Sequence, residues 1–318
     1  MKERETYRVP QLGGSIPLLM HPDFEEVRAY TKEFVDQVLD VEAADAYDAL
    51  RGDYVNTGAR YMSMIYPDAV FERLKLMARF SSAWTYLDDL MDNSLDIARV
   101  EAVYDRFAAA VFGGIDGDLI CQPVTAFFAR TDWHPELRQL CTEQFLGYLR
   151  AVKSMRNIEI NRNPIAVDEY LELRAPNCAM KVLHAFAGYM TADLAEAWCL
   201  AARTDSYQRA VHLSGEAQGI VLDLYMVNAE RPEITEWTRV DRVIQRNSRQ
   251  KAGRQQAIDT AVTLFNDRNS RAEREIAEVA SRFPAVAAAM RNVHRSTLVY
   301  LARARGLRYA IPQPGGQT

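Results

Sequence analysis

The chain has 318 residues, of which 48% are hydrophobic and 25% charged, so it carries enough apolar side chains for a sizeable core. Its net charge of −5 excludes the basic surface that binds nucleic acid. The four cysteines stand far apart without a metal-binding spacing, and no apolar run reaches the length of a membrane span. With no signal peptide recognisable at the N-terminus, we expect a cytoplasmic protein with reduced cysteines.

Residues 1–20 are expected to form an extended arm, because two prolines and two glycines interrupt any regular element there. Beyond them almost the whole chain shows the apolar spacing of helices, and no segment shows the alternation of a strand. Helices are predicted at 23–39, 43–51, 68–92, 97–112, 135–157, 167–174, 178–189, 192–203, 206–228, 239–246, 255–283 and 286–304. Since no linker or repeat divides them, we predict one all-α domain over 21–312, followed by a disordered tail at 313–318.

The most informative stretch is the acidic run that ends the helix after Trp84. The apolar stripe through Phe80 and Trp84 continues into Asp88 and Asp92, which lie one turn apart on the same face. Two neighbouring carboxylates repel each other and resist desolvation unless a cation joins them. Their hard oxygen atoms suit Mg²⁺ that bridges to a phosphorylated substrate. The alternative is a solvated acidic helix end.

The block from Tyr66-Pro67-Asp68 to Asp88-Asp89-Leu90-Met91-Asp92 resembles the class I terpene synthases of bacteria, and the resemblance extends over roughly 21–312. It implies a single helical bundle around a central apolar cavity. In that family the first carboxylates of an aspartate-rich motif hold Mg²⁺ against the diphosphate of a prenyl substrate. The resemblance therefore implies that Asp88 and Asp89 are catalytic and that Asp88 and Asp92 are metal ligands.

A second landmark of the same resemblance is the segment YLELRAPNC, in which Pro176 is predicted to break a helix. It resembles the kinked helix of the family, which makes Arg174 the diphosphate sensor, Asn177 the linker position and Cys178 the effector position. A guanidinium suits a sensor because it stays charged and can grip two phosphate oxygens at once. The alternative is an arginine that caps a helix end or pairs on the surface.

The C-terminal landmark is Arg308-Tyr309, which resembles the terminal pair of the family. Members of that pair hydrogen-bond the diphosphate as the site closes. The resemblance thus implies that Arg308 and Tyr309 take part in catalysis and diphosphate binding.

The second metal motif of the family places Asn, Ser and Glu at positions i, i+4 and i+8 of one helix. Here Asp223 and Glu230 match, but Leu222 replaces the asparagine and Met226 replaces the serine. Neither replacement offers Mg²⁺ a hard oxygen ligand. The resemblance implies that up to three Mg²⁺ ions bind, and whether one of them binds at this motif stays open.

Three interpretations of this altered motif remain open. Asp223 and Glu230 could hold a metal with extra waters, assisted by Glu216 in the same row. The enzyme could instead rely on the aspartate-rich motif and the arginines, with a weaker dependence on Mg²⁺. In the third interpretation the site no longer ionises a substrate.

An apolar and aromatic wall folds the prenyl chain in this family, and ring faces stabilise cationic centres. We expect Phe80 and Trp84 in that wall, with Met180, Leu222 and Met226 as further candidates, and ordinary core packing as the alternative for each. Two histidines within helical patterns, His184 and His212, are interpreted as core or cap residues rather than bases.

The leading hypothesis is a lyase that ionises a linear prenyl diphosphate, 15 carbons before 20, and forms a terpene hydrocarbon or alcohol. A chain-elongating prenyltransferase is one alternative, but it requires a second aspartate-rich motif that 216–230 lacks. The other is a non-catalytic member that binds prenyl diphosphates or a protein partner, which the altered second motif favours. A homodimer is the candidate assembly.

Overall fold

The computed structural model describes residues 7–10, 12, 19–42, 50–92, 94, 96–114, 117–227, 237–248 and 253–303. These residues form helices and no β-strand, apart from an isolated bridge between Ala69 and Thr191. The prediction of an all-α fold is therefore confirmed. Most of the expected N-terminal arm and the whole expected tail at 313–318 lie outside the described residues.

The helices follow one another along the whole described chain. They are α1 (Phe24–Glu42), α3 (Arg51–Val55), the π-helix η1 (Asn56–Tyr61), α4 (Met62–Ile65), α5 (Phe71–Asp92), α6 (Ile97–Val111), α7 (Gln122–Ala129), α8 (Pro135–Asn161), α9 (Val167–Asn177), α10 (Met180–Met190), α11 (Ala195–Ala202), α12 (Asp205–Tyr225), α13 (Val240–Asn247), α14 (Arg254–Ala280) and α15 (Pro284–Arg303). None of the helices that the structure describes is long and apolar enough to cross a membrane.

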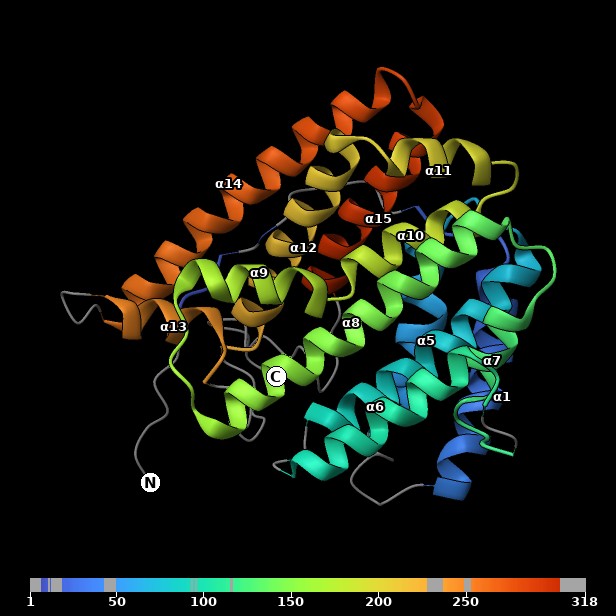
Figure 1. Cartoon of the computed structure of the whole chain (residues 1–318), viewed down its shortest axis with the longest axis horizontal. Helices are drawn as coiled ribbons and strands as arrows, with labels where there is room; N and C mark the ends of the chain where they lie inside the picture. The colour runs from blue at the N-terminus through green and yellow to red at the C-terminus, as the bar shows by residue number, and fades with distance from the viewer. Residues whose placement is uncertain are drawn as a thin grey trace, which may run out of the picture.

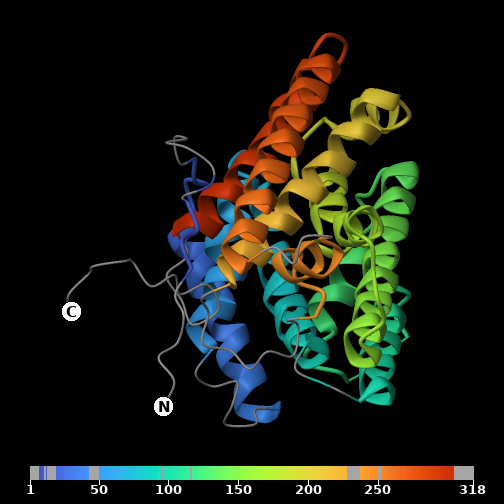
Figure 2. The same cartoon turned by 90° about the vertical axis from the view of Figure 1, so that its left-hand side faces the viewer.

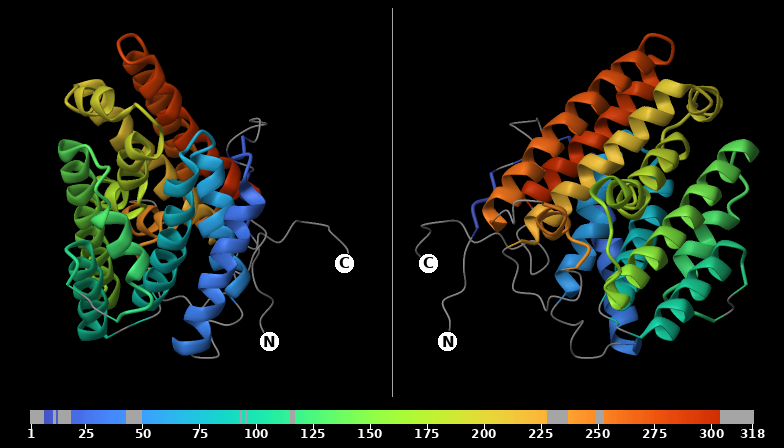
Figure 3. Two further views of the ribbon diagram at one scale, coloured as in Figure 1. Left: turned by 90° about the vertical axis from the view of Figure 1, so that its right-hand side faces the viewer. Right: turned by 60° about the vertical axis from the view of Figure 1, so that its left-hand side comes forward.

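The helices form two groups joined through α8 and α10. Figure 1 shows α14 and α12 toward one side of the molecule and α5, α6 and α7 toward the other, with α8 and α10 between them. The view in Figure 2 separates α14 and α15 from α8. Figure 3 shows α12, α14 and α15 side by side, and these three helices contact one another. The buried apolar side chains form two clusters. One includes α5, α8 and α10 together with the end of α14 and the start of α15, and the other includes α9, the second half of α12, α13, the start of α14 and the end of α15.

Two regions differ from the sequence prediction. The chain from Arg51 to Ile65 is a helix with a π-helical middle, where a helix was expected only up to residue 51. Helix α7 was not predicted at all. Helix α7 is short and mostly apolar, and the stretch from Arg51 to Ile65 changes its helical period in the middle, so neither presents the regular apolar and polar faces on which the prediction depends. The proline at residue 123 nevertheless suits the first turn of α7, where no N–H partner is required.

The aromatic core holds the middle of α5 in place. Phe80 is fully buried, and its ring centroid lies 5.2–6.1 Å from those of Phe127, Phe128, Phe145 and Phe186. Burying one such ring stabilises the fold by about 1.5–3 kcal/mol, and the edge-to-face contacts add to this. The rings therefore fix the helix two turns before its acidic end.

Two glycines allow α9 to approach α12 closely. A Cβ atom at Gly219 would lie 2.4 Å from Cγ of Arg174, and one at Gly215 would lie 2.6 Å from the carbonyl oxygen of Ala175. A larger side chain at either position would push α9 away. The close approach brings Arg174 directly against α12.

The predicted break at Pro176 is displaced toward the C-terminus. Helix α9 continues to Asn177, and the amide of Cys178 still donates to the carbonyl of Arg174 at 3.0 Å. The chain turns at Ala179, whose φ of 67° is left-handed. Pro176 cannot donate a hydrogen bond to the carbonyl oxygen four residues before it, so α9 lacks one bond in its last turn and ends one residue later.

Candidate active site

One cavity of about 220 Å³ collects most of the residues that the sequence singles out. It is bounded by α5, α8, α9, α12 and α15 together with η1 and the segment before α13. Of the sequence-predicted residues, the cavity lining contains Trp84, Asp88, Asp92, Arg174, Asn177, Cys178, Leu222, Asp223 and Met226.

Three predicted residues that the structure describes do not line the cavity. Asp89, Phe80 and Met180 are fully buried and do not line the cavity. Phe80 is occupied by the aromatic core described above, so its expected place in the wall is not observed. The remaining three, Glu230, Arg308 and Tyr309, lie outside the described residues.

The two adjacent aspartates of α5 face different surroundings. Asp88 lines the cavity, and the Tyr148 hydroxyl donates a 2.5 Å hydrogen bond to its Oδ1. Asp89 accepts a 2.9 Å hydrogen bond from the Tyr54 hydroxyl on the opposite side of the helix, within the core. Consecutive helical residues point in different directions, so one acid faces the cavity while its neighbour anchors α3 to α5. Burial, together with the Asp88 carboxylate, raises the pKa of Tyr148, which therefore remains a hydrogen-bond donor.

Arg174 is held by partners on two helices. Its Nη2 donates to Oδ1 of Asp223 at 2.9 Å, and its Nη1 donates to Oδ1 of Asn177. Burial opposes the charge of Arg174, but the neighbouring acidic groups, with Asp223 foremost, together outweigh burial, and the pKa of the guanidinium is raised. The arginine is thus fully charged within the cavity.

The Asp223 carboxylate is engaged by protein donors. Its Oδ2 accepts hydrogen bonds from the Tyr170 hydroxyl and, at 2.8 Å, from the backbone amide of Val240. With Arg174 on the other oxygen, Asp223 joins α9, α12 and the start of α13. A metal ion at Asp223 would have to share the two carboxylate oxygens with these three donors.

Within the part of the chain that the structure describes, the donor set fits Mg²⁺ beside Asp88 and Asp92 but not beside Leu222 and Met226. Asp88 and Asp92 present carboxylates one turn apart, both in the cavity lining, and such oxygens are the ligands that Mg²⁺ prefers. Across the cavity, α12 contributes the alkyl side chain of Leu222, and the thioether of Met226 follows at its end. Neither is a ligand for a hard cation.

Arg156 is a lining residue that the sequence analysis missed. It is 3% exposed, and its Nη2 donates to the carbonyl oxygen of Ser94 at 2.5 Å. Among the described residues, neither its Nε nor its Nη1 has a hydrogen-bond acceptor, and the same holds for Nε of Arg174. Unpaired buried N–H groups are costly, so this cavity is suited to receive an anionic ligand. The signal was present in the sequence, because Arg156 continues the apolar stripe of Phe145, Leu149 and Val152 on α8.

A buried acid on α8 fixes the segment that precedes α13. Glu159 accepts hydrogen bonds from the backbone amides of Trp237 and Thr238, at 2.7 and 2.6 Å, and from the Thr238 hydroxyl. Burial raises the pKa of Glu159, although these hydrogen bonds oppose the shift. The contact places Thr238 and Arg239 in the cavity lining. Arg239 in turn donates to Oδ1 of Asp241 at 2.7 Å.

The family model described as terpene synthase family 2, C-terminal metal binding, matches residues 79–271, which is more than half of the chain. The chain belongs to the terpene synthase family. The matched region of this terpene synthase family member spans the cavity residues from Asp88 to Asp223. Family membership makes the protein an enzyme of the terpene cyclase kind. No curated protein sequence gives a significant match.

Solved structures of terpene synthases share the fold. Hedycaryol synthase in complex with nerolidol superimposes with a TM-score of 0.73 at 15% identity, covering 92% of this chain and 100% of that chain. A single-residue variant of cucumene synthase gives a TM-score of 0.70 at 16% identity, and the match covers 92% of this chain and 99% of that chain. For α-eudesmol synthase the TM-score is 0.73 at 13% identity, and the match covers 92% of this chain and 98% of that chain. At these identities the likeness establishes the terpene synthase fold of this family member.

Proposed function

We propose that this protein is a class I terpene synthase that ionises a linear prenyl diphosphate with Mg²⁺. The carbocation becomes a terpene hydrocarbon or alcohol, and diphosphate is released. The observation that carries the proposal is the single cavity in which the carboxylates of Asp88 and Asp92 meet the guanidinium groups of Arg156 and Arg174 beside an aromatic wall.

Asp88 and Asp92 would hold the metal, since they form the hard-oxygen pair of the cavity. Bound there, Mg²⁺ would supply Lewis-acid neutralisation of the charge that develops on the leaving diphosphate. The second motif is proposed to contribute less than in the family, because Leu222 and Met226 cannot coordinate and Asp223 is engaged by protein donors. Glu230 remains a proposed ligand.

The diphosphate would be gripped by arginines. Arg174 is oriented by Asp223 and Asn177, and its Nε together with Nε and Nη1 of Arg156 offers N–H groups without acceptors among the described residues. Charge-assisted hydrogen bonds from such groups to phosphate oxygens are among the stronger ones in proteins. Because they are positioned before the reaction, they stabilise the departing anion at no cost of reorganisation. Arg308 and Tyr309 are proposed to join them when the site closes.

Other residues that line the cavity would stabilise the carbocation and keep nucleophiles away from it. The rings of Trp84, Tyr61 and Tyr300 line the cavity, and ring faces of this kind stabilise positive charge. Cys178, at the proposed effector position, donates its thiol proton to the carbonyl of Gly215 at 3.1 Å. Burial raises the pKa of this thiol, so the cavity presents a neutral sulfur rather than a thiolate that would capture the cation.

A 15-carbon substrate is the first to test, and a 20-carbon substrate is the next. The 15-carbon alcohol nerolidol bound to hedycaryol synthase, whose fold this chain shares, supports that order.

The proposal is tested by incubating the purified protein with 10-, 15- and 20-carbon prenyl diphosphates, with Mg²⁺ or with a chelator, and analysing the organic extract by mass spectrometry. We expect a terpene product that disappears with the chelator. If the folded protein binds prenyl diphosphates but releases no product from any of them, the second candidate holds. That candidate is a non-catalytic binding protein, and the loss of ligands at Leu222 and Met226 is the observation that favours it.

A further inference from the structure

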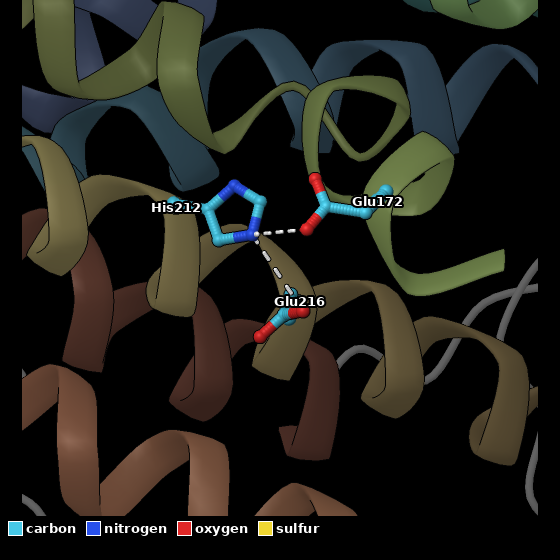
Figure 4. A group of neighbouring side chains, drawn as sticks. All are labelled: Glu172, His212 and Glu216. Carbon is cyan, nitrogen blue, oxygen red and sulfur yellow. Dashed lines mark ion pairs between the residues drawn. The ribbon is translucent and has the colours of Figure 1, made fainter. Parts of the chain in front are cut away.

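A second group of ligand-type side chains lies between α9 and α12, and none of its members lines the cavity described above. Glu172 comes from α9, while His212 and Glu216 lie one turn apart on α12 (Figure 4). One ligand atom from each of the three residues lies within 4.8 Å of the other two. These residues also line a separate surface cavity of about 510 Å³.

The distances within the group suit a bound ion better than direct contact. Nε2 of His212 faces both carboxylates in Figure 4, at 3.6 Å from Oε1 of Glu172 and 3.6 Å from Oε1 of Glu216. Both separations exceed an ordinary N–H···O hydrogen bond. Two ligands bound at about 2.0–2.1 Å with a tetrahedral angle lie roughly 3.4 Å apart. The two distances from Nε2 of His212 are therefore close to those between ligands of one ion, and the two carboxylates offer ligand atoms within 4.8 Å of each other.

The inner carboxylate is already oriented for such a role. Glu216 has a side chain that is 7% exposed, and its Oε2 lies 2.7 Å from Nε of Arg268, while its Oε1 faces His212. The contact with Arg268 is an ion pair without a hydrogen bond from Nε, and it places a positive charge beside Oε2 while Oε1 remains directed toward His212. Glu172 is 70% exposed and forms the outer, solvent-facing member.

Other cations surround the group, and two of them are paired elsewhere. Lys181, Arg209 and Arg271 also line the surface cavity. Arg209 forms an ion pair with Glu275 at 3.1 Å, and Arg271 forms one with Asp267 at 3.5 Å. Those pairs reduce the positive field that an incoming cation meets.

We propose that Glu172, His212 and Glu216 bind a divalent transition-metal ion of the Zn²⁺ class, with water completing its coordination. One imidazole and two carboxylates form a donor set that favours Zn²⁺ or Co²⁺ over Mg²⁺, which prefers oxygen ligands alone. The ion ties α9 to α12 at the contact where Gly215 and Gly219 admit α9. The ion is thus a structural metal site that cross-links α9, the helix that carries Arg174, to α12.

The test uses the full-length protein, stripped with a chelator and then titrated with Co²⁺ or Zn²⁺. We expect the visible absorption of imidazole-bound Co²⁺ and calorimetric binding of one Zn²⁺ to this site. Zn²⁺ at a hundredfold excess over its dissociation constant raises the melting temperature by about 5 °C. His212→Ala and Glu172→Gln each weaken binding by at least about tenfold. Glu172 is exposed, so its variant folds normally, and His134→Ala is the matched histidine control.

The double variant Asp88→Asn/Asp92→Asn separates this site from the proposed active site. It retains Zn²⁺ binding and the Co²⁺ spectrum if the proposal is correct. Loss of both signals in that variant assigns the ion to the cavity of the proposed active site and overturns the proposal. Unchanged affinity in His212→Ala, or no binding by the folded wild-type protein, overturns it as well. None of these results depends on whether the protein turns over a prenyl diphosphate.

Discussion

Nη2 of Arg174 lies 2.9 Å from Oδ1 of Asp223, and this ion pair joins α9 to α12 within the cavity. The two side chains are 15% and 8% exposed, so the pair is shielded from solvent. Asp223 therefore acts first on Arg174: it keeps the guanidinium charged and fixes its direction. This differs from the role of metal ligand that the resemblance suggested for Asp223.

Asp223→Asn is expected to destabilise the protein by about 3–5 kcal/mol, because it leaves the largely buried Arg174 without its counter-charge. Urea denaturation followed by circular dichroism measures the change. Glu25→Gln, which breaks an exposed pair with Arg28, is the control and should leave the unfolding curve unchanged. Equal stability of Asp223→Asn and the wild type would contradict a structural role for the pair.

Asp88 and Asp89 provide a matched comparison within one turn of α5. Asp88→Asn removes a cavity carboxylate and is expected to reduce turnover at least a hundredfold while the melting temperature stays close to that of the wild type. Asp89→Asn disturbs the hydrogen bond from Tyr54 in the core, so it costs about 1–3 kcal/mol of stability while turnover per folded molecule persists. Kinetic assays measure the turnover of both variants, and thermal melts measure their stability. The opposite pattern would move the proposed metal site from Asp88 to Asp89.

Arg156→Met is expected to weaken inorganic diphosphate binding by roughly tenfold to a hundredfold, since it removes charge-assisted hydrogen bonds. Stability should not fall, because the variant also removes two buried N–H groups without acceptors among the described residues. Calorimetry and thermal melts measure the two effects. Arg150→Met, on the exposed side of α8, is the control that changes neither. Unaltered diphosphate affinity in Arg156→Met would remove this arginine from the proposed site.

The double variant Leu222→Asn/Met226→Ser restores the ligand types that the family carries at these positions. Because both residues line the cavity, we expect the Mg²⁺ concentration for half-maximal turnover to fall several-fold. Kinetic titration with Mg²⁺ measures this, with Leu222→Met as a control that adds no hard ligand. An unchanged Mg²⁺ requirement would show that the engagement of Asp223, rather than the missing ligands, limits metal binding on this side.

Because two histidines are buried in the folded protein, we expect its stability to fall in weak acid. His184 and His294 share Ser214, whose hydroxyl oxygen lies 3.2 Å from Nε2 of His184 and 2.8 Å from Nδ1 of His294. Burial, followed by the neighbouring His294, lowers the pKa of His184 to about 3, and burial lowers the pKa of His294 to about 4. In the unfolded chain both titrate near about 6.5.

The unfolded state therefore binds more protons than the folded state between these values, and stability falls as the pH drops from about 6.5 through about 4. Urea midpoints measured across this range test the effect. His184→Gln should flatten the dependence by removing one of the two groups. A wild-type midpoint that stays constant from about pH 6.5 to about 4 would contradict the neutral buried pair.

The sequence predicted the local geometry well. The helical spacing from Phe71 onward placed Asp88 and Asp92 on one face of α5, and the structure has both in the cavity lining. That relationship follows from the 3.6-residue turn alone and needs no other part of the chain. The same regularity predicted most of the long helices to within a few residues.

The tertiary structure decided which helices meet. Arg174 and Asp223 are 49 residues apart in sequence, and their pairing depends on the close approach of α9 to α12 at Gly215 and Gly219. The different surroundings of Asp88 and Asp89 likewise depend on the tertiary structure. Tyr148 packs against the side of α5 that carries Asp88, and Tyr54 packs against the side that carries Asp89. Local hydrogen bonding determines which side chains share a helix face, whereas the partner across that face is selected by packing between segments distant in sequence.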